Sequence, residues 1–495
     1  MSAILVALVT FPFAVAVVTY VLPTTASRIV TVCSGAIAFA LSLVLVPVAA
    51  DHAQVTAGSV LRVDALSVVF LVATTFLYGA TAVFTSGYLH LGSGASGERY
   101  GRRFYAGLNL FCWSMVAAPL VNGLALLWVA VEITTVVSAL LVAIDDTDGA
   151  TEAAWKYVLL ASLGLGIALF ATVIMYYAGT TVFGPAYDLS YTKLLNGASR
   201  FPPDIVRLAF VMAVLGFGTK MGLAPVHTWL PDAHSEAPTP VSALLSGALL
   251  AISFYAILRY FQIAVRTLGP TFPRNTLLVF GLVSLLLAAL YVLSQRDLKR
   301  LLAYSSVEHM GILAIGMSFG ARIAIVGVLL HVLAHAAAKG TAFFGAGSVV
   351  RKFTTKDMAK IRGGVGALPW SGPLFVVAIL ALSAMPPFGL FRSEFLIVQG
   401  GLADGRDAIA ASLVVLVTVA FFGLSWFATR TMLTPSVADG PDHVAVATPP
   451  RGEVSGWIVA SMVIGVAALA VLGVHPPASL GHLLAHAANE LGAAR

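Results

Sequence analysis

The chain has 495 residues and a formal net charge of +6; 59% of its residues are hydrophobic, only 10% are charged, and the mean hydropathy is +0.94. A soluble globular domain of this length is excluded, because such domains carry about 25% charged residues. Most of the chain must therefore lie in lipid.

The predicted elements are membrane-spanning helices, since a bilayer core about 30 Å thick needs about 20 apolar residues per helix and about fourteen segments meet that length. In chain order they cover residues 2–22, 28–50, 66–90, 104–121, 123–144, 155–178, 205–226, 240–265, 274–294, 302–319, 321–347, 370–396, 408–430 and 455–475. The first segment has no basic leader and no cleavage site, so we expect a span rather than a cleaved signal. We predict one all-α polytopic membrane domain over residues 1–495, with its longest loops at 179–204 and 431–454.

Lysine and arginine accumulate in the cytoplasmic loops of membrane proteins. With the N-terminus outside, these loops receive the densest basic clusters, which are Arg99, Arg102 and Arg103; Arg296, Lys299 and Arg300; and residues 351–362. The acidic loop from Asp145 to Glu152 is an exception that the rule tolerates, because acidic residues count little in it. We therefore predict a multi-pass protein of the cell inner (plasma) membrane with both termini on the outer face.

Only two cysteines are present, Cys33 and Cys112, both within apolar spans. Two thiols cannot hold an iron–sulfur cluster, and the sequence has no zinc-ligand spacing. It also has no phosphate-binding glycine loop, although it contains 45 glycines. We therefore expect no metal, nucleotide or redox cofactor in this chain and assign any redox chemistry to partner subunits.

Two predicted spans are interrupted by proline. Span seven breaks at LAPVHTWLP after Lys220, and span twelve breaks at MPPFG ahead of Glu394. Transporters often contain inverted repeats whose broken helices meet near the membrane midplane, so we predict two such five-helix repeats, spans four to eight and spans nine to thirteen. The alternative is that proline is simply frequent in membrane helices. The predicted divisions are 104–265 and 274–430 for the repeats, and 1–90 and 455–495 for the flanking helices.

Ionisable residues within apolar spans are functional candidates, because a charge at the bilayer centre costs about 2.5–3.5 kcal/mol on insertion scales. Glu132 lies mid-span in LLWVAVEITTVVSALLV, and Lys220 follows an uncharged run. The alternatives are a neutral, hydrogen-bonded carboxyl group and a lysine that snorkels from a span end. If the two approach each other, a desolvated lysine held by a carboxylate would act as a switchable proton carrier.

Span eleven, LLHVLAHAAAKGTAFF, carries His331, His335 and Lys339 at intervals of four residues. At about 100° per residue they share an arc of about 80° on one helix face, which suits a proton relay. The alternatives are hydrogen-bonded core histidines and metal binding by the two histidines. Glu394, beside Arg392, is either part of a proton path or half of a helix-end ion pair.

Two further groups lie near the ends of predicted spans. Glu308 and His309, at the start of span ten, are either a helix cap or a proton-uptake group. His227, Asp232 and His234 are either metal ligands or parts of a proline-rich, helix-breaking turn, and we favour the turn. We place His309 and His227 on the predicted proton path.

Several stretches together resemble a known family, the antiporter-like membrane subunits shared by complex I, Mrp-type cation antiporters and membrane-bound group 4 hydrogenases. The resemblance covers about residues 60–435 and is carried by VEITTVVSALLV, KMGLAPVHTWLPDAHSEAPTPVSALLSGALL, QRDLKRLLAYSSVEHMG, HVLAHAAAKGTAFF and MPPFGLFRSEFLI. Within the family, WKYVLLASLGLGIALF, SSVEHMG and PPFGLFRSEFLI are most similar to the hydrogenase-4 component F branch.

The resemblance implies fourteen helices, two inverted five-helix repeats, and a central axis of glutamate, lysine and histidine through which protons move. Glu132 matches the glutamate that gates the span-seven lysine, and Lys220 matches that lysine. The other matches are the span-eleven row and the charged residue that ends the path, namely His331, His335, Lys339 and Glu394. Together with the two residues at span ends, the predicted proton path is Glu132, Lys220, His227, His309, His331, His335, Lys339 and Glu394.

One position departs from the family pattern. Complex I relatives commonly carry a lysine in span eight, where this chain has Ala251, so water or His309 is expected to bridge the middle of the path. The chain also ends about twenty residues after the last predicted span, without the lateral helix of the distal complex I subunit. We therefore expect a middle or hydrogenase-type position in a complex.

These observations predict a proton-translocating membrane subunit of a redox-driven oxidoreductase complex, of the hydrogenase-4/formate hydrogenlyase or NADH:quinone oxidoreductase type. The predicted partners are other membrane subunits and peripheral iron–sulfur, nickel–iron hydrogenase-like or flavin subunits, with no nucleic acid. The alternatives are a subunit of a cation/proton antiporter or of an ion-driven inorganic-carbon uptake system, and a scaffold that has lost conduction.

Overall fold

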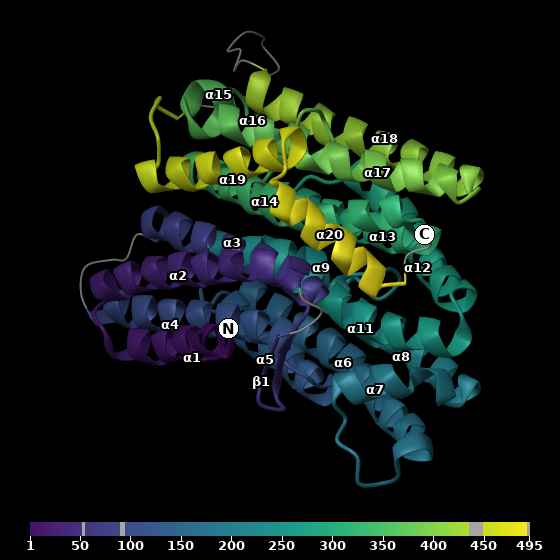
Figure 1. Cartoon of the computed structure of the whole chain (residues 1–495). Helices are drawn as coiled ribbons and strands as arrows, with labels where there is room; N and C mark the ends of the chain where they lie inside the picture. The colour runs from purple at the N-terminus through teal and green to yellow at the C-terminus, as the bar shows by residue number, and fades with distance from the viewer. Residues whose placement is uncertain (52–54, 90–94, 435–448, 493–495) are drawn as a thin grey trace.

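A computed structural model describes residues 1–51, 55–89, 95–434 and 449–492. Most of the predicted loop 431–454 lies outside these residues. Within them, the one sheet is a small antiparallel hairpin of β1 (Val55–Ala57) and β2 (Leu61–Val63). Nearly everything else is helical, and Figure 1 shows the long helices running alongside one another in one bundle.

In Figure 1 most early helices, purple to teal, and most late helices, teal-green to yellow, occupy different sides of the bundle. The early helices are α1 (Ser2–Val21), α2 (Thr24–Asp51), α3 (Ala65–Tyr88), α4 (Ala95–Ala117), α5 (Leu124–Val142), α6 (Asp148–Phe183), α7 (Tyr191–Gly197), α8 (Pro203–Met221), α9 (Trp229–Glu236), α10 (Thr239–Leu244) and α11 (Leu250–Leu268). The late helices are α12 (Thr271–Val292), α13 (Leu298–Phe319), α14 (Arg322–Phe353), α15 (Gly364–Ala367), α16 (Ser371–Leu382), α17 (Gly389–Ala403), α18 (Asp407–Ala428), α19 (Gly456–Val474) and α20 (Ala478–Glu490). The yellow α20 is an exception to this division, because it crosses to the early side and contacts α2 and α3. A π-helical turn, Leu245–Leu249, joins α10 to α11.

Within the described part of the chain, ten helices are long and apolar enough to cross a membrane by length and composition. The other predicted spans correspond to α4, α8 and α13, which carry charged residues, and to the broken pair α16 and α17. This agrees with the predicted all-α polytopic class. The number fourteen and the division into inverted repeats stay predictions.

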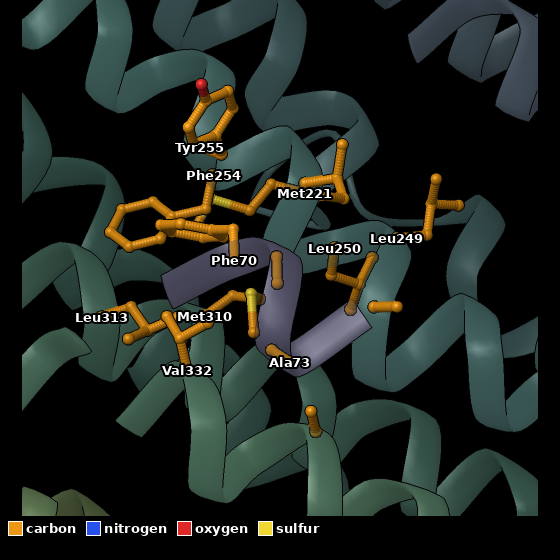
Figure 2. Packing of buried hydrophobic residues seen from close by; sticks show 14 of the residues in the cluster. Phe70, Ala73, Met221, Leu249, Leu250, Phe254, Tyr255, Met310, Leu313 and Val332 are labelled. Carbon is orange, nitrogen blue, oxygen red and sulfur yellow. The ribbon is translucent and has the colours of Figure 1, made fainter. Parts of the chain in front are cut away.

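Burial separates the central helices from those that face lipid. The most apolar window of Thr239–Leu268 is 100% buried, whereas that of Asp407–Leu433 is 28% buried. Figure 2 shows Phe70 of α3 packed among side chains of the neighbouring helices, including Phe254 of α11 and Val332 of α14. The core therefore lies around α3, α11 and α14, and the outer helices present apolar side chains to lipid.

Both predicted helix breaks are present. α8 ends at Met221, and the next residue, Gly222, takes a left-handed conformation (φ 83°, ψ 27°) that costs glycine little because it has no Cβ. α16 ends at Leu382 and α17 begins at Gly389, with the diproline between them. Proline lacks an N–H and clashes with the preceding turn, which explains why each helix stops there.

The elements that were not predicted from the sequence include the β1–β2 hairpin, α7, α9, α15 and α20. In addition, α6 extends beyond the predicted span 155–178 on both sides. Its N-terminal extension is stabilised by Thr147, whose side chain accepts a hydrogen bond from Ala150 N at 3.2 Å. These differences share one cause, because an apolar window finds the lipid-crossing part of a chain and not its polar ends.

Candidate functional site

Lys220 lies in the last turn of α8, and its side chain is fully buried. The ammonium nitrogen Nζ donates hydrogen bonds to Thr135 Oγ1 (2.7 Å) and Tyr157 OH (2.6 Å). It also lies 4.7 Å from the centroid of the Tyr157 ring, and that hydroxyl shares a further hydrogen bond with Ser138 Oγ (2.7 Å). A snorkelling lysine would reach solvent, so the structure contradicts that alternative.

Glu132 is partly buried on α5, about one helical turn before Thr135. Ser162 Oγ donates to Glu132 Oε1 at 3.5 Å, whereas Oε2 is buried without a hydrogen-bond partner among the described residues. The charges of Glu132 and Lys220 interact electrostatically. No ion pair within 4.0 Å joins them in the described part of the chain. The two groups are therefore neighbours that are not in direct contact.

Lys339 of α14 is also fully buried. Its Nζ donates to the backbone oxygen of Leu302 (2.9 Å) and to Ser305 Oγ. Ser306 Oγ donates to the same Leu302 oxygen (3.0 Å) and shares a hydrogen bond with Ser246 Oγ (2.7 Å). Ser246 lies on the π-helical turn, a feature that is frequent at functional sites. A continuous polar chain thus runs from Lys339 to the junction of α10 and α11.

Three buried histidines follow Lys339 toward α17. His309 Nδ1 lies 3.1 Å from His331 Nε2, and the His309 ring centroid lies 5.1 Å from that of His335. His331 Nδ1 lies 3.0 Å from Ser393 Oγ. Both ring nitrogens of His335 lack a hydrogen-bond partner among the described residues. Because a neutral imidazole has one donor and one acceptor nitrogen, this row is able to take up a proton at one ring and release it at another.

Glu394 closes the row. Its Oε1 lies 3.9 Å from His309 Nδ1 and has no hydrogen-bond partner within the described ranges. Arg392 donates instead to the backbone oxygen of Gly473 at 3.2 Å, so the helix-end ion pair is not formed. The ligand-type atoms of His309, His331 and Glu394 lie within 4.8 Å of one another. That trio, rather than the two span-eleven histidines, has the spacing that the metal alternative requires.

Glu308 and His309 lie in the middle of α13, so the expectation that they stand at the start of span ten is wrong. The helix begins at Leu298, and Asp297 caps it by accepting hydrogen bonds from two backbone N–H groups of the first turn, at 2.8 and 3.0 Å. Glu308 is buried and interacts electrostatically with Lys339. Each lysine of the site therefore has one carboxyl group nearby.

The three polar residues after the first helix break are not brought together. Asp232 forms two ion pairs, at 2.6 and 3.3 Å, with basic residues of other helices. His227 is buried with its ring centroid 6.4 Å from that of Tyr304, and His234 stacks on Phe343 at 5.4 Å. His227 lies in the turn between α8 and α9, as expected, whereas Asp232 and His234 lie within the short helix α9, so the interpretation as a turn is wrong for these two residues.

The middle of the predicted path has no lysine. Ala251, at the position where relatives carry a lysine, is buried, with 2% of its surface exposed. No hydrogen bond joins Lys220 to Ser246 in the described part of the chain. His309 lies with the histidine row and Glu394 rather than between the two lysines. The Ser246–Ser306 hydroxyl pair places a polar group on the π-helical turn directly before α11, the helix that carries Ala251.

Residues 121–422, which include this whole set of buried residues, match the family model described as NADH:quinone oxidoreductase/Mrp antiporter, transmembrane. The chain belongs to this family. This match confirms the predicted family and the predicted function class, a proton-translocating membrane subunit. The helical architecture confirms the predicted all-α class.

Individual members of the antiporter family extend the comparison. The hydrogenase-4 component F homolog of Methylacidiphilum infernorum (isolate V4) is 36% identical over 365 residues, which are 73% of this chain and 76% of that protein. Hydrogenase-4 component B of Escherichia coli (strain K12) is 30% identical over 367 residues, 71% of this chain but 52% of that protein, so the chain spans about half the length of that relative. A chain of the Mrp complex from Dietzia sp. DQ12-45-1b has the same fold, with a TM-score of 0.83 at 20% identity over 99% of this chain and 97% of that chain.

Sequence reasoning missed the hydroxyl groups of this antiporter-family site. Thr135 follows Glu132 by three residues in VEITT, about one helical turn, and Ser305 precedes Glu308 by the same spacing in AYSSVEH. Spacing to a buried carboxyl residue is therefore a usable signal for Thr135 and Ser305, whereas it does not mark Ser306. Nothing of this kind marks Tyr157, whose role depends on the packing of α6 against α8.

Proposed function

We propose that this antiporter-family subunit carries protons along its buried axis and that electron transfer in partner subunits of a hydrogenase-4/formate hydrogenlyase-like or NADH:quinone oxidoreductase-like complex drives the movement. The observation that supports this most is the burial of Lys220 and Lys339, each with hydroxyl acceptors and a nearby carboxyl group. Charges within a membrane are costly and mark ion or proton pathways.

The first step takes place at Glu132 and Lys220. In the conformation described, neutral hydroxyl groups hold the ammonium group and the carboxylate is not in contact with it. A partner subunit that moves α5 relative to α8 would make and break this ion pair. Making the pair stabilises the protonated lysine and breaking it favours release, since an opposite charge within about 4–6 Å favours the charged form.

The second step passes the proton to Lys339 and then to the histidine row. The Ser246–Ser306 hydroxyl pair extends the polar chain to the α10–α11 junction, and water carries the proton between these hydroxyl groups and Lys339. The Leu302 oxygen accepts hydrogen bonds from both Ser306 and Lys339 and therefore positions them without passing a proton itself. From there His335, His309 and His331 lead to Glu394, where the proton leaves the chain. We place His227, at the α8 break, near the point of uptake.

The chain's structural relatives are subunits of multi-subunit membrane complexes, which supports other membrane subunits as partners. We extend this to peripheral iron–sulfur, hydrogenase-like or flavin subunits, because the chain has only two cysteines to contribute to redox chemistry. We place the complex in the cell inner (plasma) membrane with both termini on the outer face.

The test is purification of the chain from native membranes in mild detergent, identification of its partners, and reconstitution of the complex in sealed vesicles. We expect redox subunits in the preparation and proton uptake that persists when choline replaces sodium and potassium. Uptake that requires sodium or potassium, together with small antiporter subunits, would instead support a cation/proton antiporter. Bicarbonate-dependent uptake would support inorganic-carbon transport, and a complex without proton flux would leave only the scaffold.

A further inference from the structure

A groove of about 930 Å³ lies on the outside of the bundle between α1, α4 and α5. The C-terminal ends of α1 and α5 and the N-terminal end of α4 line one end of it, at Tyr20, Ile144 and Arg99. None of the residues on the proposed proton path lines this groove. It is therefore a separate feature of the lipid-facing surface.

The polar end of the groove is basic. Arg99, Arg103 and Gly107 recur every four residues and share one face of α4. Both arginines are exposed, and neither forms an ion pair or hydrogen bond with a described residue. Arg102, on the adjacent face, differs because its Nε pairs with Glu98 at 3.3 Å. Two guanidinium groups therefore line the groove without a hydrogen-bond or ion-pair partner among the described residues.

Acidic groups at this end do not cancel the charge. Asp146 lines the groove as its one carboxylate. The neighbouring Asp145 accepts a hydrogen bond from Tyr100 OH at 2.6 Å. A second hollow of about 440 Å³, lined by Arg99, Arg102 and Arg103 together with Tyr20, Ala95 and Glu98, continues the basic surface.

Beyond the arginines the walls are apolar and open to the outside. Phe13 and Val17 of α1 are 45% and 56% exposed, and Leu140 of α5 is 70% exposed. A stretch from Tyr20 to Phe13 is about 10 Å long at 1.5 Å per residue, which matches part of an extended acyl chain. Gly107 allows α4 and α5 to pack closely beneath the groove, since a Cβ there would lie 2.8 Å from Leu141 Cδ2.

We propose that this groove is a specific site for an acidic phospholipid, whose phosphate lies between Arg99 and Arg103 and whose acyl chain lies along Val17 and Leu140. Guanidinium groups match phosphate oxygens in a bidentate geometry. Basic pockets between membrane helices on the cytoplasmic side bind anionic headgroups, and the predicted topology places Arg99 and Arg103 on that side. Zwitterionic lipid lacks the net negative charge that two arginines select.

A helix of a neighbouring subunit fits these features less well. It would bury Arg99 and Arg103 away from water, which is unfavourable unless it also brings acidic side chains. A lipid phosphate neutralises both arginines while its headgroup stays hydrated. The charge of the rim and the apolar walls therefore point to the same occupant.

Native mass spectrometry of the purified full-length chain tests the site after delipidation and titration with dioleoyl phosphatidylglycerol or dioleoyl phosphatidylcholine. The wild type should retain phosphatidylglycerol at least tenfold better than phosphatidylcholine. The double variant Arg99→Gln/Arg103→Gln should lose this preference. The matched control Lys360→Gln/Arg451→Gln removes two exposed positive charges elsewhere and should keep it.

A second pair of variants tests the acyl-chain part without changing charge. Leu140→Trp fills the groove and should lower retention, whereas Leu163→Trp, at a residue of α6 that is 67% exposed, should not. Equal binding of the two lipids, equal loss in the control, or displacement by inorganic phosphate alone would overturn the proposal. A disulfide or cross-link from Val17→Cys to a partner subunit in the assembled complex, in place of bound lipid, would also overturn it.

Discussion

Lys220 and Lys339 are fully buried on α8 and α14, and each donates hydrogen bonds to a hydroxyl group from a neighbouring helix. Each also has a carboxyl group, Glu132 or Glu308, that interacts with it electrostatically. At the residue scale the axis thus contains two lysine–glutamate neighbours in series. The histidine row and Glu394 then follow the second lysine.

Glu132→Gln keeps the shape of the side chain but removes the charge that is able to pair with Lys220. We expect proton pumping by the assembled complex to fall at least tenfold while electron transfer continues, measured by quenching of a pH-sensitive dye. Glu152→Gln, which alters an exposed ion pair with Lys156, is the matched control and should pump normally. Unchanged pumping in Glu132→Gln would contradict the gating role.

Ser306→Ala removes the hydroxyl that connects Ser246 to the Leu302 oxygen. Leaving Ser246 without this partner costs about 1 kcal/mol, and the proton loses one relay point, so we expect a three- to tenfold lower pumping rate. Ser318→Ala is the control, because Ser318 is buried on the same helix and, among the described residues, its hydroxyl bonds only to the Ile315 oxygen. Equal rates in the two variants would show that Ser306 is structural.

At the scale of the elements, close packing of α6 against α8 positions Lys220. A Cβ on Gly216 would lie 2.5 Å from Ala168 N and 2.7 Å from the Gly164 oxygen, both backbone atoms that cannot give way easily. We expect Gly216→Ala to lower the melting temperature in detergent by several degrees and to reduce pumping. Gly166→Ala, where a Cβ meets nothing within 4 Å, should gain about 1 kcal/mol of helix propensity. The opposite order of melting temperatures would contradict this packing.

The helix α20 is attached to the start of α3 through Glu490. Its two carboxylate oxygens accept hydrogen bonds from Ala65 N (3.2 Å) and Leu66 N (3.0 Å). Burial, and then the nearby Asp64 carboxylate, raise the pKa of Glu490 to about 8 from the ordinary value of 4.5. Because the docked pKa is the higher one, this contribution to docking is complete below about pH 4.5 and is lost as the pH rises through about 8.

We therefore expect amide hydrogen exchange in α20, corrected for the intrinsic rate, to accelerate between pH 5 and pH 8. Glu490→Gln, which stays neutral, should flatten this dependence. His482 and His486 also lie on α20 and remain in both proteins, so the difference between them isolates Glu490. An unchanged pH profile in the variant would contradict the assignment.

The lysines and the helix breaks were predictable from the sequence, whereas the Ser246–Ser306 hydroxyl pair was not. A lysine in an apolar run and a diproline in a helix each carry a large energetic cost, so Lys220, Lys339 and MPPFG stand out alone. Serine and threonine are tolerated throughout membrane helices because they bond their own backbone, and only packing distinguishes Ser306 from Ser318. The expected span 302–319 leaves out the polar first turn of α13, which begins at Leu298. For that reason Glu308 was wrongly expected near the start of the helix.

For the whole molecule, the predicted topology places the uptake side, the basic rim of the lipid groove and the densest Lys/Arg clusters on the cytoplasmic face. In a Cys33→Ser background, Lys193→Cys should react with a membrane-impermeant maleimide on intact cells, whereas Lys360→Cys should react only after permeabilisation. Lys193 and Lys360 are 52% and 71% exposed, so both cysteines are accessible once the reagent reaches them. The reverse pattern would invert the topology and the direction of proton flow.

In the proposed mechanism, electron transfer in partner subunits drives protons across the membrane by way of Lys220. The most direct test of this claim is the number of protons moved per electron pair by the assembled complex in sealed vesicles, compared between the wild type and Lys220→Ala. Lys193→Ala, at an exposed residue that pairs with Asp188 at 2.8 Å, is the matched control. We predict a lower ratio for Lys220→Ala with electron transfer retained, and an unchanged ratio for the control; an unchanged ratio for Lys220→Ala would contradict the claim.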